Sequence, residues 1–307
     1  MAQLVKLADY ISRYEINPFH YPTQYIRLKR ENWQQLQLMW KNENELEQTT
    51  AEENGFERDG RSWIPFARKR EEREETDTFE RHLPQTREGL TRYFLNELYP
   101  FQLKWATSTI SQISFIDPKF EHDFMLKQLL QRLPDIYLLM YYPVFSIRKA
   151  PIDSEIILIS PIGVEIISII ETSSEATVYV GDDRTWNVEI YGDVKRIISP
   201  TIALKRTEQI VKSILRKMRI NFPVQKTVIS DRAPILYVEE PYNIQVVGKH
   251  QFDEWIQDKR QLSAPLKNEQ LRAIEALLTY CQSTSVKRPE WVDEDESLAS
   301  LQFEEKQ

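Results

Sequence analysis

Residues 151–174, PIDSEIILISPIGVEIISIIETSS, decide the expected fold. Two apolar, β-branched runs meet at Pro161-Ile162-Gly163, and this pattern predicts a hairpin with strands at residues 152–160 and 164–171. Four acids lie at the edges of these runs or within them, namely Asp153, Glu155, Glu165 and Glu171. Glu155 and Glu165 interrupt the apolar pattern. If they face the interior, each needs a partner or a raised pKa.

Further strands and helices are predicted on both sides of this hairpin. A strand at 136–147 precedes it, and a shorter hairpin turning at Gly181-Asp182-Asp183 follows it. Helical patterns cover residues 86–99, 117–134, 200–219, 251–259 and 268–281, and short strand patterns cover 224–229, 235–238 and 244–247. This order predicts an α/β (α+β) fold in which helices flank a mixed β-sheet.

The chain divides into four expected parts. Residues 1–112 form a helical, charge-rich N-terminal region, and residues 113–262 form the sheet domain. Residues 263–286 form a C-terminal helix. Residues 287–307 are acidic and poor in apolar side chains, so this tail is expected to be disordered.

Composition excludes several kinds of site. The 307 residues include seven glycines and no glycine-rich phosphate-binding motif. The single cysteine, Cys281, excludes an intramolecular disulfide and a cysteine-based zinc cluster, and the four histidines lack metal-ligand spacing. The formal charge of −7 gives no overall attraction to nucleic acid. Because no signal-peptide core or membrane-length apolar run is found, we expect a cytoplasmic protein that does not bind membranes.

Segments in four regions of the chain resemble the nuclease-related domain (NERD) family, a branch of the PD-(D/E)XK nuclease-like fold, in the family's order. FEHDFMLKQLLQRLP resembles its opening helix, and SEIILISPIGVEII resembles the hairpin that follows. GDDRTWNVEIYG and SPTIALKRTEQIVKSIL resemble its later hairpin and helix. The segment at 224–256 resembles its closing strands and helix. The resemblance covers residues 113–259 and implies a restriction-endonuclease-like sheet with a metal site for cleaving nucleic acid.

The functional positions of the family are altered in this chain. Counting from Pro161 and Gly163 places Glu155 where the family has its metal-binding aspartate. The Glu-x-Lys pair falls on Ser168 and Ile170, or, with a gap, on Glu171 and Ser173. The Asn-Pro-x-x-Gln motif becomes Ser199-Pro200-Thr201-Ile202-Ala203, which lacks both amides. The lysine is missing in either alignment.

This pattern favours a catalytically impaired nuclease-like protein that acts by binding or interaction and needs no cofactor. Its vestigial site candidates are Glu121, Glu155 and Glu171. An alternative is a divergent nuclease acting on DNA or RNA, in which these acids hold Mg²⁺ or Mn²⁺ and Lys195 or Arg196 supplies the missing cation.

A second alternative is a non-catalytic nucleic-acid-binding protein. Four basic residues share one face of the helix that follows Pro200, namely Lys205, Lys212, Arg216 and Arg219. Such a row could follow phosphates along a nucleic-acid backbone. The partner is therefore expected to be either another protein or a nucleic acid.

Overall fold

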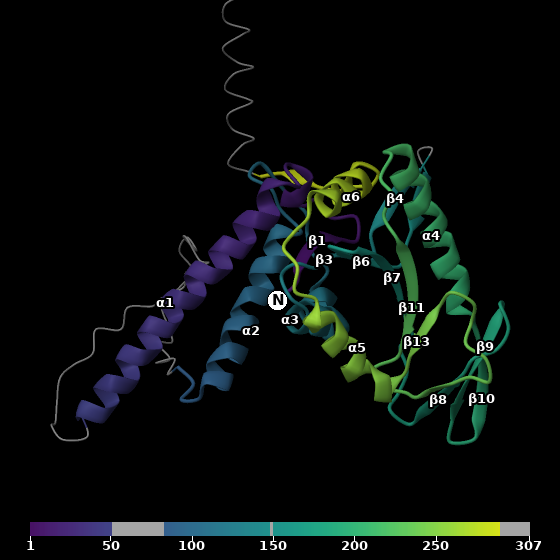
Figure 1. The fold of residues 1–307 in the computed structure, drawn as a ribbon, viewed down its shortest axis with the longest axis horizontal. Coiled ribbons are helices and arrows are strands. Elements are labelled where there is room, and N and C mark those ends of the chain that lie inside the picture. The colour runs from purple at the N-terminus through teal and green to yellow at the C-terminus, as the bar shows by residue number, and fades with distance from the viewer. Residues whose placement is uncertain (51–82, 148–149, 289–307) are drawn as a thin grey trace, which may run out of the picture. The chain divides into compact units, whose positions relative to one another are not determined.

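The computed structural model describes residues 1–50, 83–147 and 150–288 (Figure 1). The chain forms two compact units, one of residues 1–21 with 102–307 and one of residues 22–101. Residues 1–21 and 102–112 thus belong with the sheet, which differs from the expected helical region at 1–112. Nearly all of the tail at 287–307 lies outside the described residues. No helix in the described part is long and apolar enough to cross a membrane.

The first unit is built on a six-stranded mixed sheet with the order β1-β3-β6-β7-β11-β13. β6 runs antiparallel to both of its neighbours, whereas the pairs β1/β3, β7/β11 and β11/β13 are parallel. These strands are β1 (Gln3–Leu7), β3 (Leu138–Tyr141), β6 (Ile156–Ser160), β7 (Gly163–Ile169), β11 (Val224–Ile229) and β13 (Gln245–Val247). The predicted hairpin is β6–β7, and the predicted mixed sheet flanked by helices is confirmed.

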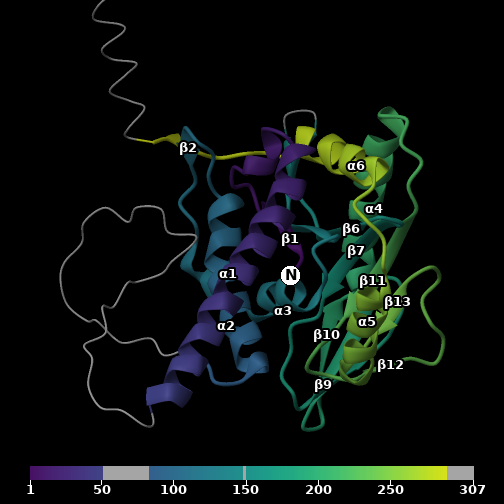
Figure 2. The ribbon, with the colours of Figure 1, turned by 60° about the vertical axis from the view of Figure 1, so that its left-hand side comes forward.

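Helices cover both faces of this sheet. α4 (Pro200–Lys217) packs on β7 and β11 from one side, and α5 (Lys249–Gln261) lies on the other (Figure 1). α4 begins with proline in its first turn and buries one apolar stripe that includes Val211, Ile214 and Leu215. α6 (Asn268–Thr279) packs beside α4 (Figure 2). The pattern at 117–134 forms the short helix η2 (Pro118–Glu121) and then α3 (Phe124–Arg132), because Asp123 caps a new helix.

Two predicted strands are broken by local geometry. The expected strand at 136–147 ends after β3, because Tyr142 has a φ of +46° and Pro143 follows it. The chain then forms β4 (Val144–Ile147) and β5 (Ala150–Asp153), which pair with each other. β6 therefore begins only at Ile156, and Glu155 lies in the link that precedes it.

A second, four-stranded sheet has the order β10-β9-β8-β12. Its strands are β8 (Ala176–Tyr179), β9 (Thr185–Ile190), β10 (Asp193–Ile198) and β12 (Ile235–Leu236). Tyr191 and Gly192, with φ of +50° and +87°, form the tight turn between β9 and β10. One face of this sheet buries Trp186 and Val178. β10 was not predicted, because three of its six residues are charged.

β1 was not predicted either, and several contacts fix it in the first unit. The Lys6 side chain is fully buried, and its Nζ contacts Tyr10 O at 2.7 Å, Glu15 Oε1 at 2.6 Å and Ser283 Oγ at 2.7 Å. The Gln102 amide bonds to Leu4 N and Ala2 O, which lie along β1. Near the C-terminus, β14 (Val286–Lys287) pairs with β2 (Gln112–Ile113). The first and the last described strands are therefore held in the same unit.

The second unit is a pair of helices, with residues from α1 (His20–Thr50) and α2 (Arg87–Trp105). The rings of Trp33 and Phe94 lie 5.1 Å apart, and Trp40 Nε1 donates to Pro84 O at 2.6 Å. α2 extends the helix predicted at 86–99 and continues through Pro100. Aromatic side chains of this region thus pack between helices, as in ordinary hydrophobic contacts.

Candidate functional site

The β6–β7 hairpin presents an acid on each face of the large sheet. Leu158 pairs with Glu165 and Ile156 pairs with Ile167, so Glu155 lies across from Ser168 at the open end. Alternate residues of a strand point to opposite faces. Glu165 therefore faces α5, and Ser168 faces α4.

Glu155 is held between the hairpin and α4. Its backbone N–H donates to Thr207 Oγ1 of α4 at 3.1 Å. Burial raises the pKa of the Glu155 carboxyl, while a hydrogen bond from Ser168 and the positive charge of Arg206 act in the opposite direction. The Arg206 guanidinium is also fixed near this acid, because its Nη2 donates to Asp153 O at 2.9 Å. Glu155 is thus a partly buried acid with a hydroxyl and a cation as neighbours.

Three acids raise the pKa of the phenol of Tyr142, the residue that follows β3. Burial raises the pKa of this phenol, and the negative charges of Glu155, Glu171 and Asp123 raise it further. Asp123 is fixed by two contacts, since it caps α3 and accepts a hydrogen bond from the Tyr141 hydroxyl at 2.8 Å. The phenol of Tyr142 therefore stays protonated and can act as a hydrogen-bond donor.

The structure separates the three vestigial candidates. Glu155 and Glu171 both raise the pKa of Tyr142, although the Glu171 side chain is exposed. Glu121 is exposed on η2, and Asp123 is instead the acid at the start of α3 that belongs to this group. Sequence reasoning missed Asp123 because the predicted helix start at Asp117-Pro118 proved to be a separate short turn. The cation beside Glu155 is Arg206, whereas Lys195 and Arg196 belong to β10 of the small sheet.

These residues do not fit a divalent metal ion. Within residues 1–50, 83–147 and 150–288, no group of three or more acidic, histidine or cysteine side chains could hold one. A hard cation prefers several carboxylate oxygens, whereas Glu155 has a serine hydroxyl opposite it and the charge of Arg206 close by. Ile170, at the lysine position of the ungapped alignment, is a buried apolar side chain.

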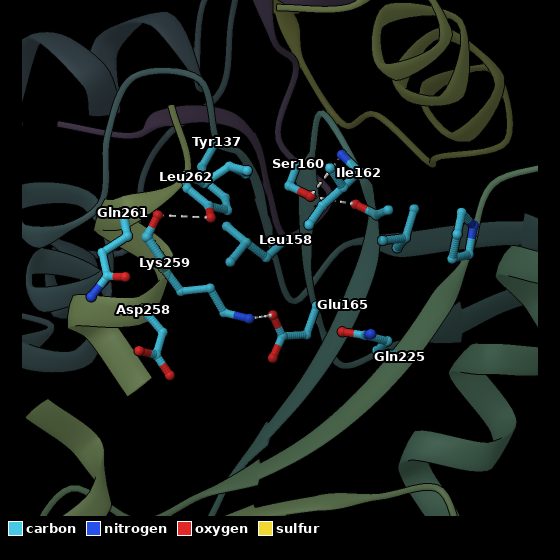
Figure 3. A pocket seen from close by; sticks show the side chains of 13 residues that line it. Tyr137, Leu158, Ser160, Ile162, Glu165, Gln225, Asp258, Lys259, Gln261 and Leu262 are labelled. Carbon is cyan, nitrogen blue, oxygen red and sulfur yellow. Dashed lines mark hydrogen bonds and ion pairs between the residues drawn. The ribbon is translucent and has the colours of Figure 1, made fainter. Parts of the chain in front are cut away.

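Glu165 forms a second polar cluster on the α5 face. Its Oε1 accepts hydrogen bonds from Thr227 Oγ1 at 2.6 Å and from Trp255 Nε1 at 3.2 Å. Its Oε2 lies 2.6 Å from Lys259 Nζ (Figure 3). The partner that the sequence requires for an inward-facing acid is therefore supplied by β11 and α5. The pKa of Glu155, in contrast, is raised by burial, because Ser168 and Arg206 offset that burial only in part.

A cavity of about 380 Å³ lies beside this cluster, at the turn of the hairpin (Figure 3). Leu158, Ile162 and Leu262 give it apolar walls, and Lys259 and Glu165 lie at its polar side. Tyr137 donates from its hydroxyl to Lys259 O at 2.9 Å, and burial, with the charge of Glu165, raises the pKa of that phenol to about 12. All the hydrogen-bonded groups of this cluster bind one another, which indicates a structural role.

The four basic residues of the second alternative are all exposed. Two of them are already in ion pairs, Lys205 with Asp183 at 2.9 Å and Lys212 with Glu208 at 2.7 Å. Arg216 lies in the last turn of α4, and Arg219 follows the helix with a φ of +55°. Their exposed guanidinium groups are the stronger candidates for contact with phosphate, because a paired lysine must first give up its acid.

Comparison with known proteins gives one short match. The chain is 47% identical over 47 residues to an RNA 2',3'-cyclic phosphodiesterase of Geobacillus stearothermophilus. The match spans 15% of this chain and 15% of the length of that relative. No family model and no solved structure matches the chain.

We predict that Glu155→Gln changes how stability depends on pH. The pKa of Glu155 is higher in the folded state than in the unfolded state, so the folded state binds more protons at pH values between the two. The free energy of unfolding therefore falls as pH rises through that window. The variant should avoid this loss, by about 1.4 kcal/mol for every unit that separates the two values. Urea unfolding of both proteins between about pH 4 and pH 8 measures it. A constant difference between them across this range would contradict the prediction.

We predict that Lys259→Met destabilises the fold by about 3 kcal/mol, because Glu165 then stays buried without its cation. The double change Lys259→Met with Glu165→Leu should recover most of this loss. Lys205→Met is the matched control, since its ion pair with Asp183 is exposed and should contribute less than about 1 kcal/mol. Urea unfolding midpoints compare the four proteins. Equal effects of the two single changes would show that the buried pair has no special role.

Proposed function

We propose that this protein is a nuclease-like domain that has lost its cleavage chemistry and acts by binding. The observation that carries the proposal is the pairing of Glu155 with Ser168 across the β6–β7 hairpin. At this position the resemblance calls for two acids and a lysine. A hydroxyl ligates a hard cation weakly, and the apolar side chain of Ile170 cannot orient a water molecule.

The order of elements supports the nuclease-like part of the proposal. The segments that resemble the family form α3, the β6–β7 hairpin, β9 with the turn before it, α4, and then β11 with α5. They meet in one unit, and the acids at the start of α3 and of β6 both act on Tyr142. On this proposal, the former metal site lay at the open end of the β6–β7 hairpin.

Arg206 supports the change from cleavage to binding. Its guanidinium donates to the Asp153 carbonyl, and its positive charge lowers the pKa of Glu155. Arg206 thus places a positive charge in the region where cleavage would need a cation. Glu155 and Arg206 together give this end of the hairpin a donor and an acceptor for polar groups of a partner. No step of hydrolysis is required for such binding.

We predict that the purified protein does not cleave nucleic acid in the presence of Mg²⁺ or Mn²⁺. The substrates are single- and double-stranded DNA, RNA, and RNA that ends in a 2',3'-cyclic phosphate. The last substrate is included because of the named activity of the relative that matches over 47 residues. Wild type and Glu155→Ala should both match a buffer control, because one carboxylate does not hold the metal. Electrophoresis of labelled substrates measures cleavage.

The matched control for this assay is Glu275→Ala, which removes an exposed carboxylate on α6. Cleavage that requires the metal, is lost in Glu155→Ala and is kept in Glu275→Ala would overturn the proposal. That result would favour the divergent nuclease, with Glu155 as a metal ligand.

The basic face of α4 provides a separate proposal, in which the protein binds nucleic acid without cleaving it. Each phosphate neutralised contributes about −0.9 to the slope of log affinity against log salt on duplex DNA. Because Lys205 and Lys212 are paired with acids, we predict a slope near −2 from Arg216 and Arg219. Fluorescence anisotropy with labelled DNA at several salt concentrations measures it.

Arg216→Gln with Arg219→Gln should remove this salt dependence, and Lys205→Gln with Lys212→Gln should change it little. Binding that stays equally strong from low to moderate salt would exclude an electrostatic site on this helix.

A further inference from the structure

The small sheet ends in an exposed edge strand. β10 is the outermost strand and pairs with β9 alone. The residues on either side of a two-residue turn form a hydrogen-bonded pair, and such pairs alternate along an antiparallel ladder. Ser199 N still donates to Arg184 O at 2.9 Å, which places the odd-numbered residues in the bonded pairs. Val194, Arg196 and Ile198 therefore direct their backbone N–H and C=O groups away from β9.

These outward backbone groups make no hydrogen bond within residues 1–50, 83–147 and 150–288. The same residues carry their side chains on the outer face of the sheet, where Val194 is 62% exposed and Ile198 is 78% exposed. Tyr179 and Leu236 are also exposed, and the strand registers place them on that face. An edge strand thus presents both free backbone groups and apolar side chains, a combination that favours pairing with another strand.

The charges at the centre of β10 indicate what kind of strand can pair with it. Lys195 and Arg196 are adjacent and exposed, and they lie on opposite faces. In an antiparallel pair of two β10 strands, the registers with most overlap place Arg196 opposite its own copy, or Lys195 opposite its own copy. Like charges directly opposite each other are destabilising, whereas acids at these positions are favourable. The charge pattern therefore disfavours a second copy and favours an acidic strand.

We propose that β10 binds an extended acidic segment of a partner protein, which adds to the small sheet as a further antiparallel strand. Apolar residues of the partner lie opposite Val194 and Ile198, and carboxylates lie opposite Lys195 and Arg196. The partner's backbone bonds to the free groups of Val194, Arg196 and Ile198. This site is distinct from the Glu155 region and does not depend on the nuclease-like proposal.

A designed peptide tests the side-chain part of this site with the full chain. The probe is the fluorescent, end-capped peptide TVTEEVT, and the control is TVTKKVT, which differs in charge alone. The acidic peptide should bind about tenfold more tightly than the basic one. The double variant Lys195→Glu with Arg196→Glu should reverse this preference. Equal affinities, or no binding of the acidic peptide up to about 1 mM, would overturn the proposal.

A proline variant tests the backbone part. Val194→Pro removes an outward N–H but no bond to β9, so the sheet should keep its unfolding temperature while peptide affinity falls about tenfold or more. Val194→Thr keeps the N–H and controls for the loss of the valine side chain. Unchanged affinity in the proline variant would overturn the proposal. So would a dimer, seen by sedimentation, that becomes a monomer in this variant, since the edge would then be occupied by a second copy.

Discussion

The β6–β7 hairpin places one carboxylate toward each face of the large sheet, and the neighbouring elements must compensate both charges. An unpaired carboxylate in such surroundings costs several kcal/mol of folding free energy. On one face, Thr227, Trp255 and Lys259 converge on Glu165 from β11 and α5. On the other, Glu155 has Ser168 and Arg206 and a raised pKa. The positions of α4 and α5 on the sheet are coupled to these contacts.

The two acids differ in what they can still do. Both oxygens of Glu165 already have donors, two of them buried and one, Lys259, half-buried. These contacts hold α5 against the sheet. Glu155 is less buried, lies at the open end of the hairpin, and has a hydroxyl where a second carboxylate would be needed. If the proposed nuclease-like origin holds, the binding chemistry that is left from it lies at Glu155. The cavity beside Glu165 owes its polar side to a structural ion pair.

The sequence predicts features that depend on neighbouring residues and misses those that depend on distant ones. The hairpin was predictable, because β-branched runs and a Pro-Ile-Gly turn lie together, and so was the need of Glu165 for a partner. The identity of that partner was not predictable, since Lys259 comes from a helix that follows six further strands of the two sheets. β1 was missed because its five residues gain their stability from pairing with β3, far along the chain. Asp123 was passed over for Glu121 because the helix restarts between them.

Two of the edge strands, β1 and β10, show how differently the chain treats its sheet edges. β1 is completely buried, and the Gln102 side chain bonds to Leu4 N and Ala2 O as a neighbouring strand would. An edge satisfied in this way cannot accept another chain. No side chain of the described residues bonds to the outer backbone groups of β10 in the way that Gln102 bonds to those of β1. Its two adjacent basic residues discourage self-association while leaving the backbone groups accessible. An edge that excludes its own copy but stays open is consistent with selection for a particular partner strand rather than with a strand that merely lacks protection.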